Sequence, residues 1–203
     1  MTPVTSLGPR TLIGRFIALE PLEERHHEEL LRAAADPETW TYIPVDPGKG
    51  FAAHLPWMVE ENAKGNVISF VTRSLTDNAI VGSSSYLNIM PSNARVEIGF
   101  TWYTAAARGG PVNPEAKYLL LENAFAAHYN RVEFKTDARN ARSRAALLKL
   151  GAKEEGILRG HMWMPQGYFR DSVYFSILAS EWPSVRAGLE GRLGAYQAPS
   201  AAL

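Results

Sequence analysis

Hydrophobic and polar positions follow two different periods along the chain, and these periods separate expected strands from expected helices. Alternating or short apolar runs predict strands at residues 16–19, 67–73, 80–89, 95–103, 131–137, 153–164 and 168–178. Helical spacing predicts helices at residues 23–35, 51–64, 114–128 and 141–150, and a last helix that begins at Ser180. The short turns between residues 67 and 103 predict an antiparallel meander. The helix at 114–128 predicts instead a crossover to a parallel strand.

This order of elements predicts an α/β fold with a mixed, mostly antiparallel, twisted sheet of about seven strands flanked by helices. Neither an internal repeat nor a long linker interrupts the pattern, so we expect one domain over residues 10–195. The small, polar and proline-bearing ends predict flexible tails at residues 1–9 and 196–203.

Charge and cysteine content narrow the classes of partner. The 21 basic and 21 acidic residues give a formal net charge of zero, so we expect neither a nucleic acid nor a membrane as partner. The lack of cysteine excludes disulfides, thiolate metal sites and a cysteine nucleophile, and we expect no metal. Without a secretory or membrane-spanning pattern, the expected location is cytoplasmic.

A glycine-containing loop at residues 107–115 joins a predicted strand to a predicted helix. Gly109 and Gly110 let backbone approach a ligand, and Asn113 and Pro114 are expected as N-cap and first helical residue. The free N–H groups of such a helix start suit a phosphate or diphosphate, whereas the alternative is a tight turn with an ordinary cap. The loop matches neither the Walker loop nor the dinucleotide fingerprint.

Three consecutive segments resemble the acetyl-CoA region of GNAT acetyltransferases, in particular the branch similar to ribosomal-protein N-terminal acetyltransferases. They are EIGFTW at 97–102, RGGPVN at 108–113 and EAKYLLL at 115–121. The resemblance continues at 19–22, 140–144, 150–152, 155–159 and 170–178. It covers roughly residues 10 to 195, and its segments follow the same order as the predicted elements.

The resemblance implies the GNAT fold and acetyl-CoA as cosubstrate. It implies that the strand ending at Trp102 splays from its neighbour and that the pantetheine arm bonds to backbone near Phe100, Thr101 and Trp102. The diphosphate would lie on the loop of Arg108, Gly109, Gly110, Pro111, Val112 and Asn113. The family has glycine where this chain has Pro111, and a small residue where it has Asn113. Because proline has no N–H group, one phosphate donor is missing.

The start of the helix at 141–150 is expected to contact the cofactor too. Asn140 is a helix cap, and the resemblance adds a hydrogen bond to the pantetheine arm. Ser143 matches the proton donor to the coenzyme A sulfur, although a serine in a first helical turn often bonds to backbone instead. Arg144 belongs to a basic cluster that either meets the cofactor's 3′-phosphate or forms a solvated helix face.

Acyl transfer to an amine needs a path for the amine's proton. Glu97 is the candidate base because it begins the strand along the cofactor, with a structural ion pair as the alternative. His161 stands where related enzymes use a carboxylate, and it is the second candidate. Trp40 and Tyr42 are candidates for the acceptor pocket, or else for the core.

The leading hypothesis is an N-acetyltransferase that moves an acetyl group directly from acetyl-CoA to a primary amine, on a protein N-terminus or a small molecule. The alternative is a CoA-binding regulatory or scaffold protein on the same fold without turnover. The sequence determines neither the identity of the acceptor amine nor whether the chain forms a homodimer.

Overall fold

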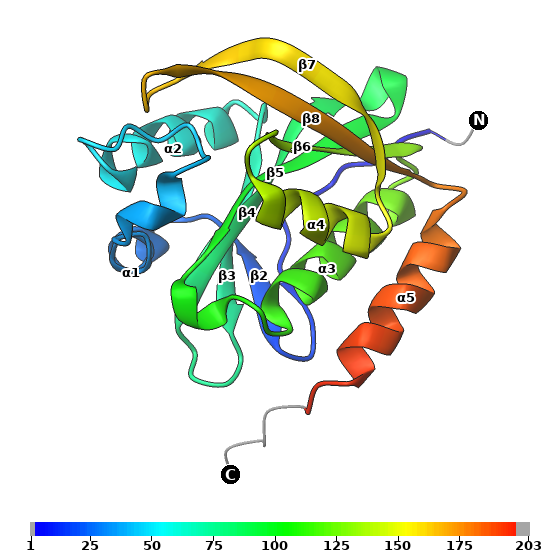
Figure 1. The fold of residues 1–203 in the computed structure, drawn as a ribbon. Coiled ribbons are helices and arrows are strands. Elements are labelled where there is room, and N and C mark those ends of the chain that lie inside the picture. The colour runs from blue at the N-terminus through cyan, green and yellow to red at the C-terminus, as the bar shows by residue number, and fades with distance from the viewer. Residues whose placement is uncertain (1–2, 198–203) are drawn as a thin grey trace.

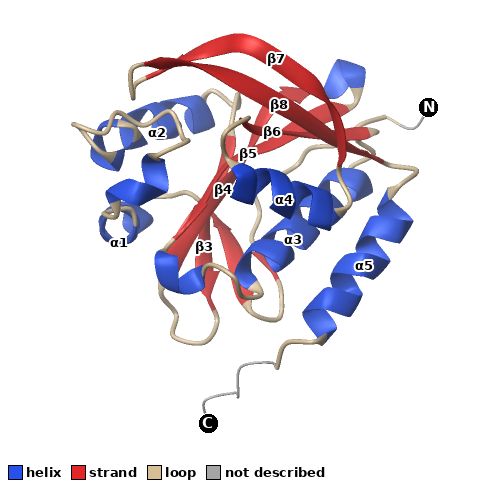
Figure 2. Cartoon of the chain, viewed as in Figure 1, coloured by secondary structure: helices blue, strands red, loops and turns tan. Residues whose placement is uncertain are grey.

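The computed structural model describes residues 3–197, and these form one eight-stranded sheet flanked by helices (Figures 1 and 2). The strand order is β1-β2-β3-β4-β5-β6-β8-β7. The strands are β1 Leu12–Ile13, β2 Ile17–Pro21, β3 Ile68–Ser74, β4 Ile80–Met90, β5 Arg95–Tyr103, β6 Arg131–Asp137, β7 Lys153–Met164 and β8 Tyr168–Leu178. The predicted fold class is confirmed, and the additional strand is the two-residue β1 beside β2.

The helices lie where the periodicity predicted them, with differences at their ends. They are α1 His27–Ala33, α2 Leu55–Ala63, α3 Val112–Ala126, α4 Ala141–Leu150 and α5 Trp182–Gly194. Short 3₁₀ turns, η1 Glu24–His26 and η3 Phe51–Ala53, occupy the first residues of the two predicted N-terminal helices. The last helix begins at Trp182 rather than Ser180, with Pro183 in its first turn.

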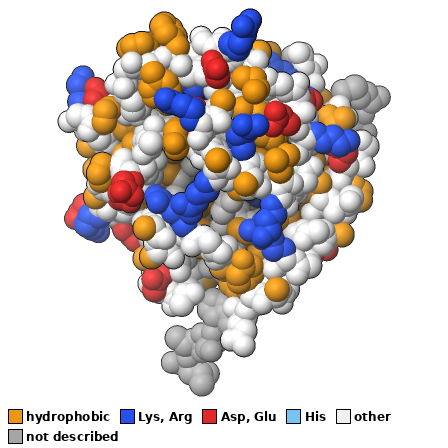
Figure 3. All heavy atoms as spheres, viewed as in Figure 1, with side chains coloured by type: hydrophobic (Ala, Val, Ile, Leu, Met, Phe, Trp, Pro, Cys, Tyr) orange, Lys and Arg blue, Asp and Glu red, His pale blue; other side chains and the backbone are white. Residues whose placement is uncertain are grey.

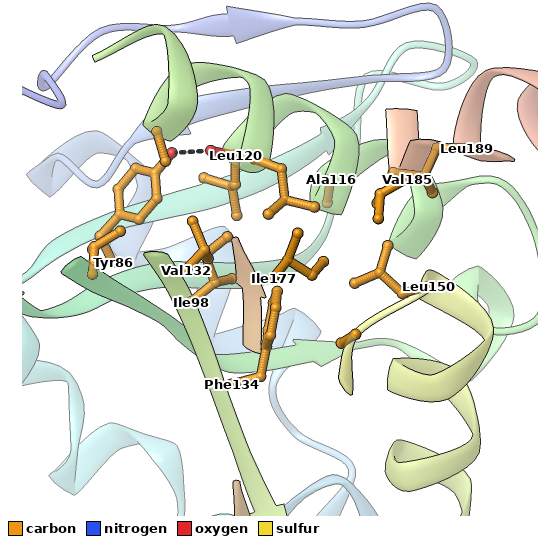
Figure 4. Close-up of a cluster of buried hydrophobic side chains, with 14 of the residues drawn as sticks. Tyr86, Ile98, Ala116, Leu120, Val132, Phe134, Leu150, Ile177, Val185 and Leu189 are labelled. Carbon is orange, nitrogen blue, oxygen red and sulfur yellow. Dashed lines mark hydrogen bonds between the residues drawn. The ribbon is translucent and has the colours of Figure 1, made fainter. Parts of the chain in front are cut away.

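All neighbouring strands are antiparallel except β5 and β6, which the α3 crossover makes parallel. Helices α3, α4 and α5 cover one face of the sheet, and α1 and α2 cover the other face near β3, β4 and β5 (Figure 1). On the first face Tyr86 is fully buried and donates a hydrogen bond to the Leu120 carbonyl (Figure 4). The sheet therefore separates two apolar cores, one on each of its faces.

A buried carboxylate fixes the start of α3 to the first strands. Glu115 accepts hydrogen bonds from the backbone N–H groups of Arg15, Phe16 and Ile17 at 2.7–2.8 Å. Gly14 is required beside it, because a Cβ atom there would lie 2.4 Å from the Glu115 carboxyl carbon. Charged hydrogen bonds of this kind are stronger than neutral ones. They therefore hold α3, the helix that follows the predicted cofactor loop, firmly against the first strands.

The N-terminal segment contacts the domain. The Thr5 N–H group donates to the Ala127 carbonyl, and Leu7 is buried in the core beside α3, whereas the pattern predicted a loose tail at 1–9. Residues 1–2 of that tail, and 198–203 of the C-terminal one, lie outside the described residues. None of the helices in the described range is long and apolar enough to cross a membrane.

Candidate functional site

The parallel strands β5 and β6 separate partway along their length. They pair only from Arg95 to Glu97 on β5 and from Arg131 to Glu133 on β6. A bulge in β5 places two residues, Phe100 and Thr101, opposite a single residue of β4, and Phe100 has a φ of +50°. Such a bulge bends a strand and leaves its backbone groups unpaired. Beyond Glu97 and Glu133 the two strands are not paired, and this unpaired stretch is the opening between β5 and β6. The splayed strand that the resemblance implied is present.

The bulge also turns neighbouring side chains toward opposite faces. Phe100 stacks on His54 with ring centroids 4.3 Å apart, on the side of α1 and α2. Trp102 is buried on that side too, against Trp40 at 5.3 Å. The Thr101 hydroxyl instead lies 2.7 Å from the Ser84 hydroxyl.

The loop after β5 presents free amide groups at the start of α3. The N–H groups of Gly109, Gly110, Val112 and Asn113 have no hydrogen-bond partner within residues 3–197. A Cβ atom on either glycine would meet nothing within 4 Å, so the loop leaves room for a ligand against its backbone. Four free donors at a helix start fit a diphosphate.

Helix α3 begins earlier than the sequence predicts. Asn113 is not the N-cap and Pro114 is not the first helical residue, because α3 begins at Val112 with Pro111 as its N-cap. Proline is tolerated throughout the first turn, where its missing N–H group would have no helical partner, so Pro114 permits this earlier start. The Arg108 guanidinium donates to the Tyr103 carbonyl and to Thr39, which ties the loop to the strand end and to the chain after α1.

Lys117 on α3 is a buried cation at the same opening, which the sequence reasoning missed. Its Nζ atom lies 2.9 Å from the Thr101 hydroxyl and 5.7 Å from the centre of the Phe134 ring on β6. Burial lowers the pKa of Lys117 to about 7. A signal was present in the sequence: Leu120, Leu121 and Ala124 lie three, four and seven positions later and are all buried, so the helical period places Lys117 on the inner face.

Helix α4 starts as the sequence predicts. The Asn140 side chain caps it by accepting a hydrogen bond from the Ser143 N–H group at 3.0 Å. The Ser143 hydroxyl is half-buried and has no partner among the described residues, so it is available to a ligand. Arg144 reaches the Glu154 carboxylate at 3.3 Å. Gly151 ends the helix with a φ of +97°.

The face of the sheet opposite α3 carries a polar cluster that contains both candidate bases. Glu97 is buried and accepts hydrogen bonds from Asn88 at 2.7 Å and Lys135 at 3.1 Å. His161 on β7 lies 3.0 Å from the Ser172 hydroxyl. Burial, Lys135 and Arg170 lower the pKa of His161, and Glu97 opposes them, so His161 and Glu97 lie within electrostatic reach.

Arg170 on β8 belongs to this cluster, although the sequence reasoning did not single it out. It is 4% exposed and donates to Ser172 at 2.9 Å, and its buried Nη2 atom has no partner in the described range. Asp137, the nearby acid on β6, is already bonded to Tyr168 and Arg139. An arginine within a polar run of a strand gives no sequence signal of its burial.

Trp40 and Tyr42 line a surface pocket of about 440 Å³ next to this cluster. The other lining residues are Pro37, Thr41, Pro47, Arg139, Gln166 and Tyr168. Gln166, in the turn between β7 and β8, donates to the backbone carbonyls of Trp40, Ile43 and Val45. The pocket therefore joins the loop after α1 to the β7–β8 turn.

The chain is similar to a known protein family and to several solved structures. The acetyltransferase (GNAT) domain family matches residues 17–153. A GCN5-related N-acetyltransferase from Brucella melitensis is 28% identical over 95% of this chain and 89% of that one, with a TM-score of 0.87. A structure from T. thermophilus described as an acetyltransferase is 39% identical over 92% and 98% of the two chains, with a TM-score of 0.81.

A more distant likeness concerns the fold alone. The RimJ protein of Mycobacterium smegmatis, whose structure is a complex with CoA-disulfide, is 22% identical over 92% of this chain and 96% of that one, with a TM-score of 0.77. No protein among the curated sequences compared matches the chain significantly.

Proposed function

The chain belongs to the GNAT acetyltransferase family, and from this premise we propose that it moves an acetyl group from acetyl-CoA to a primary amine by direct transfer. The observation that supports the proposal most is the opening between β5 and β6, with the free amides of the loop 108–113 at one end. The family uses acetyl-CoA, and the free backbone donors of the loop support binding of this cosubstrate here.

The residues around the opening suit the parts of acetyl-CoA in turn. The amides of Gly109, Gly110 and Val112 would bind the diphosphate, and the unpaired edge of β5 at Phe100 and Trp102 would bind the pantetheine arm. The face that carries α3 and α4 shows several Lys and Arg side chains near its middle, which favours an anionic ligand there (Figure 3). When bound, acetyl-CoA supplies a thioester, which is an activated acyl group.

The chain's own polar groups provide the path for protons. Glu97 or His161, on the face opposite α3, would accept the proton of the attacking amine, directly or through water. The Ser143 hydroxyl at the start of α4 would donate a hydrogen bond to the departing sulfur, where the positive end of the helix also favours negative charge. Proton acceptance from the amine and hydrogen-bond donation to the sulfur would thus take place on opposite faces of the sheet.

The acceptor amine would enter from the pocket of Trp40 and Tyr42 on the side of Glu97. At pH 7.5 roughly a quarter of an α-amine with a pKa near 8 is neutral, against about 0.1% of an ordinary lysine. An acceptor with an α-amino group, on a protein N-terminus or a small molecule, therefore needs less help from the catalytic base to lose its proton. We expect such acceptors to react faster than lysine side chains.

The competing function is a CoA-binding regulatory or scaffold protein, which the missing donor at Pro111 favours. Both functions predict CoA binding, but only the enzyme releases free CoA. A panel of N-terminal peptides, lysine, polyamines and amino acids should be incubated with acetyl-CoA at pH 7.5 to 8.5, with detection of the free thiol and of the acetylated product by mass. Binding of CoA without release by any amine would support the scaffold. A cytoplasmic location is part of the proposal, and cell fractionation would test it.

A further inference from the structure

Lys117 bridges the two sides of the opening between β5 and β6. Its backbone lies in the second turn of α3, and its amino group reaches Thr101 on β5 and the ring of Phe134 on β6. Side chains of a helix lean toward its N-terminus, so the amino group lies on the loop side of the Lys117 Cα atom. The residue is 7% exposed, and the Thr101 hydroxyl is its one hydrogen-bond partner in the described range.

The acids near Lys117 are occupied elsewhere. On β5, Glu97 is paired with Lys135 of β6 on the opposite face of the sheet. On β6, Glu133 binds Arg95 and Arg131, and Asp137 binds Arg139 and Tyr168.

The remaining charged groups on the packed elements do not reach Lys117 either. On α3, Glu115 binds backbone and Glu122 binds Trp182 and Arg186. Helix α4 has only the cations Arg142, Arg144 and Lys149, and β4 has no charged residue. Burial without a counter-ion therefore lowers the pKa of Lys117 to about 7.

A buried amino group without a counter-ion lowers the stability of the fold, whereas methionine or leucine would fill the same space without that cost. The presence of lysine here therefore indicates a role in binding. We propose that Lys117 is a further cofactor-binding residue, whose ammonium group is the buried positive partner of acyl-CoA in the opening between β5 and β6. The inference rests on the proposed function, which places the anionic cofactor in this opening. The Lys117 side chain would then compensate in part for the backbone N–H donor that Pro111 lacks.

The proposal makes cofactor binding depend on a proton, with a definite sign. In the free protein Lys117 is largely neutral above pH 7. A bound diphosphate favours its charged form and raises its pKa, so binding takes up a proton between the free and the bound pKa. Affinity is then full below about pH 7 and falls as the pH rises through that window, by at most tenfold for each pH unit.

The test uses the full chain and CoA as the probe, in titration calorimetry at pH 7.0, 7.5, 8.0 and 8.5. At each pH, two buffers of different ionisation enthalpy give the number of protons taken up. Wild type should take up more than about half a proton at pH 8. The Lys117→Met variant should lose that uptake and bind CoA about tenfold more weakly at pH 7. Lys117→Arg should keep most of the affinity without the uptake, because arginine stays charged.

Lys64→Met is the matched control, since Lys64 is exposed at the C-cap of α2 and pairs with Glu60 and Glu61. It should behave as wild type in both readouts. Lys117→Met is expected to fold, because it replaces an unpaired buried amine by an apolar side chain of similar length.

Wild-type CoA binding without proton uptake at pH 8 would overturn the inference and leave the proposed function standing, and this result needs no variant. Equal affinity and equal uptake in wild type and Lys117→Met would overturn it too. A wild-type protein that does not bind CoA at any pH would overturn the proposed function itself.

Discussion

Replacing Glu97 by glutamine separates a chemical role of this residue from a structural one. The substitution keeps the shape of the side chain and removes its charge and its ability to take a proton. If Glu97 is the base, we expect kcat at pH 7.5 to fall about 10²-fold, which corresponds to about 2.7 kcal/mol in activation free energy. If it is structural, kcat should change little.

The stability cost of the same substitution follows from the ion pair with Lys135. The Glu97 side chain is 2% exposed and that of Lys135 is 23% exposed, with 3.1 Å between Oε2 and Nζ. Removing one partner of a fully buried pair costs about 3–5 kcal/mol. Because Lys135 keeps some contact with water, we expect the free energy of unfolding to fall by about 1–3 kcal/mol. Urea denaturation would measure this loss.

Lys135→Met is the control, since it breaks the same ion pair and keeps the carboxylate. A base at position 97 predicts that Glu97→Gln loses far more kcat than Lys135→Met at similar stability. It also predicts that the defect shrinks at pH 9.5, where an α-amine acceptor is already neutral without help. Wild-type kcat in Glu97→Gln at pH 7.5, together with the stability loss, would refute the reasoning and transfer the role to His161 or water.

Three further substitutions test the cofactor site, each by CoA calorimetry and steady-state kinetics. Gly110→Val should weaken CoA binding at least tenfold and leave the fold unchanged by circular dichroism, because its Cβ atom meets no protein atom; unchanged affinity would place the diphosphate elsewhere. Pro111→Gly adds an N–H group at the N-cap of α3 and should tighten CoA binding. The opposing effect is the added loop entropy of about 1 kcal/mol. Weaker CoA binding would show that this entropy outweighs one hydrogen bond and that the proline preorganises the loop. Ser143→Ala should lower kcat about 10²-fold at similar CoA affinity, and wild-type turnover would remove this hydroxyl from the chemistry.

The order and type of the elements could be predicted because they depend on local periodicity. The predicted strands at 131–137, 153–164 and 168–178 and the helix at 141–150 coincide with β6, β7, β8 and α4. Helix starts were predicted less well. A strong N-cap such as Asn140 indicates where α4 begins. The segment from Pro111 to Pro114 is instead compatible with several first residues of α3, and the hydrogen bonds of Glu115 to the β1–β2 loop favour one of them.

The candidate site was only partly predictable, for a physical reason. The geometry of a single loop, such as the one with Gly109 and Gly110 before α3, can be recognised from consecutive residues in the sequence. Contacts between charged residues of different strands cannot be recognised in this way. Only the sheet register brings together four residues from four strands: Glu97, Lys135, Arg170 and His161.

By itself, the sequence determined the fold class, the element order and the loop at the start of α3, which rest on spacing along the chain. The resemblance to acetyltransferases rests on matching segments such as EIGFTW at 97–102. Tertiary structure alone decided where β5 leaves β6, which acids are already paired, and that the amino group of Lys117 lies buried without a counter-ion. Burial and ion pairing depend on neighbours distant in the chain, and the free energy of a charge depends on those neighbours rather than on its position in the sequence.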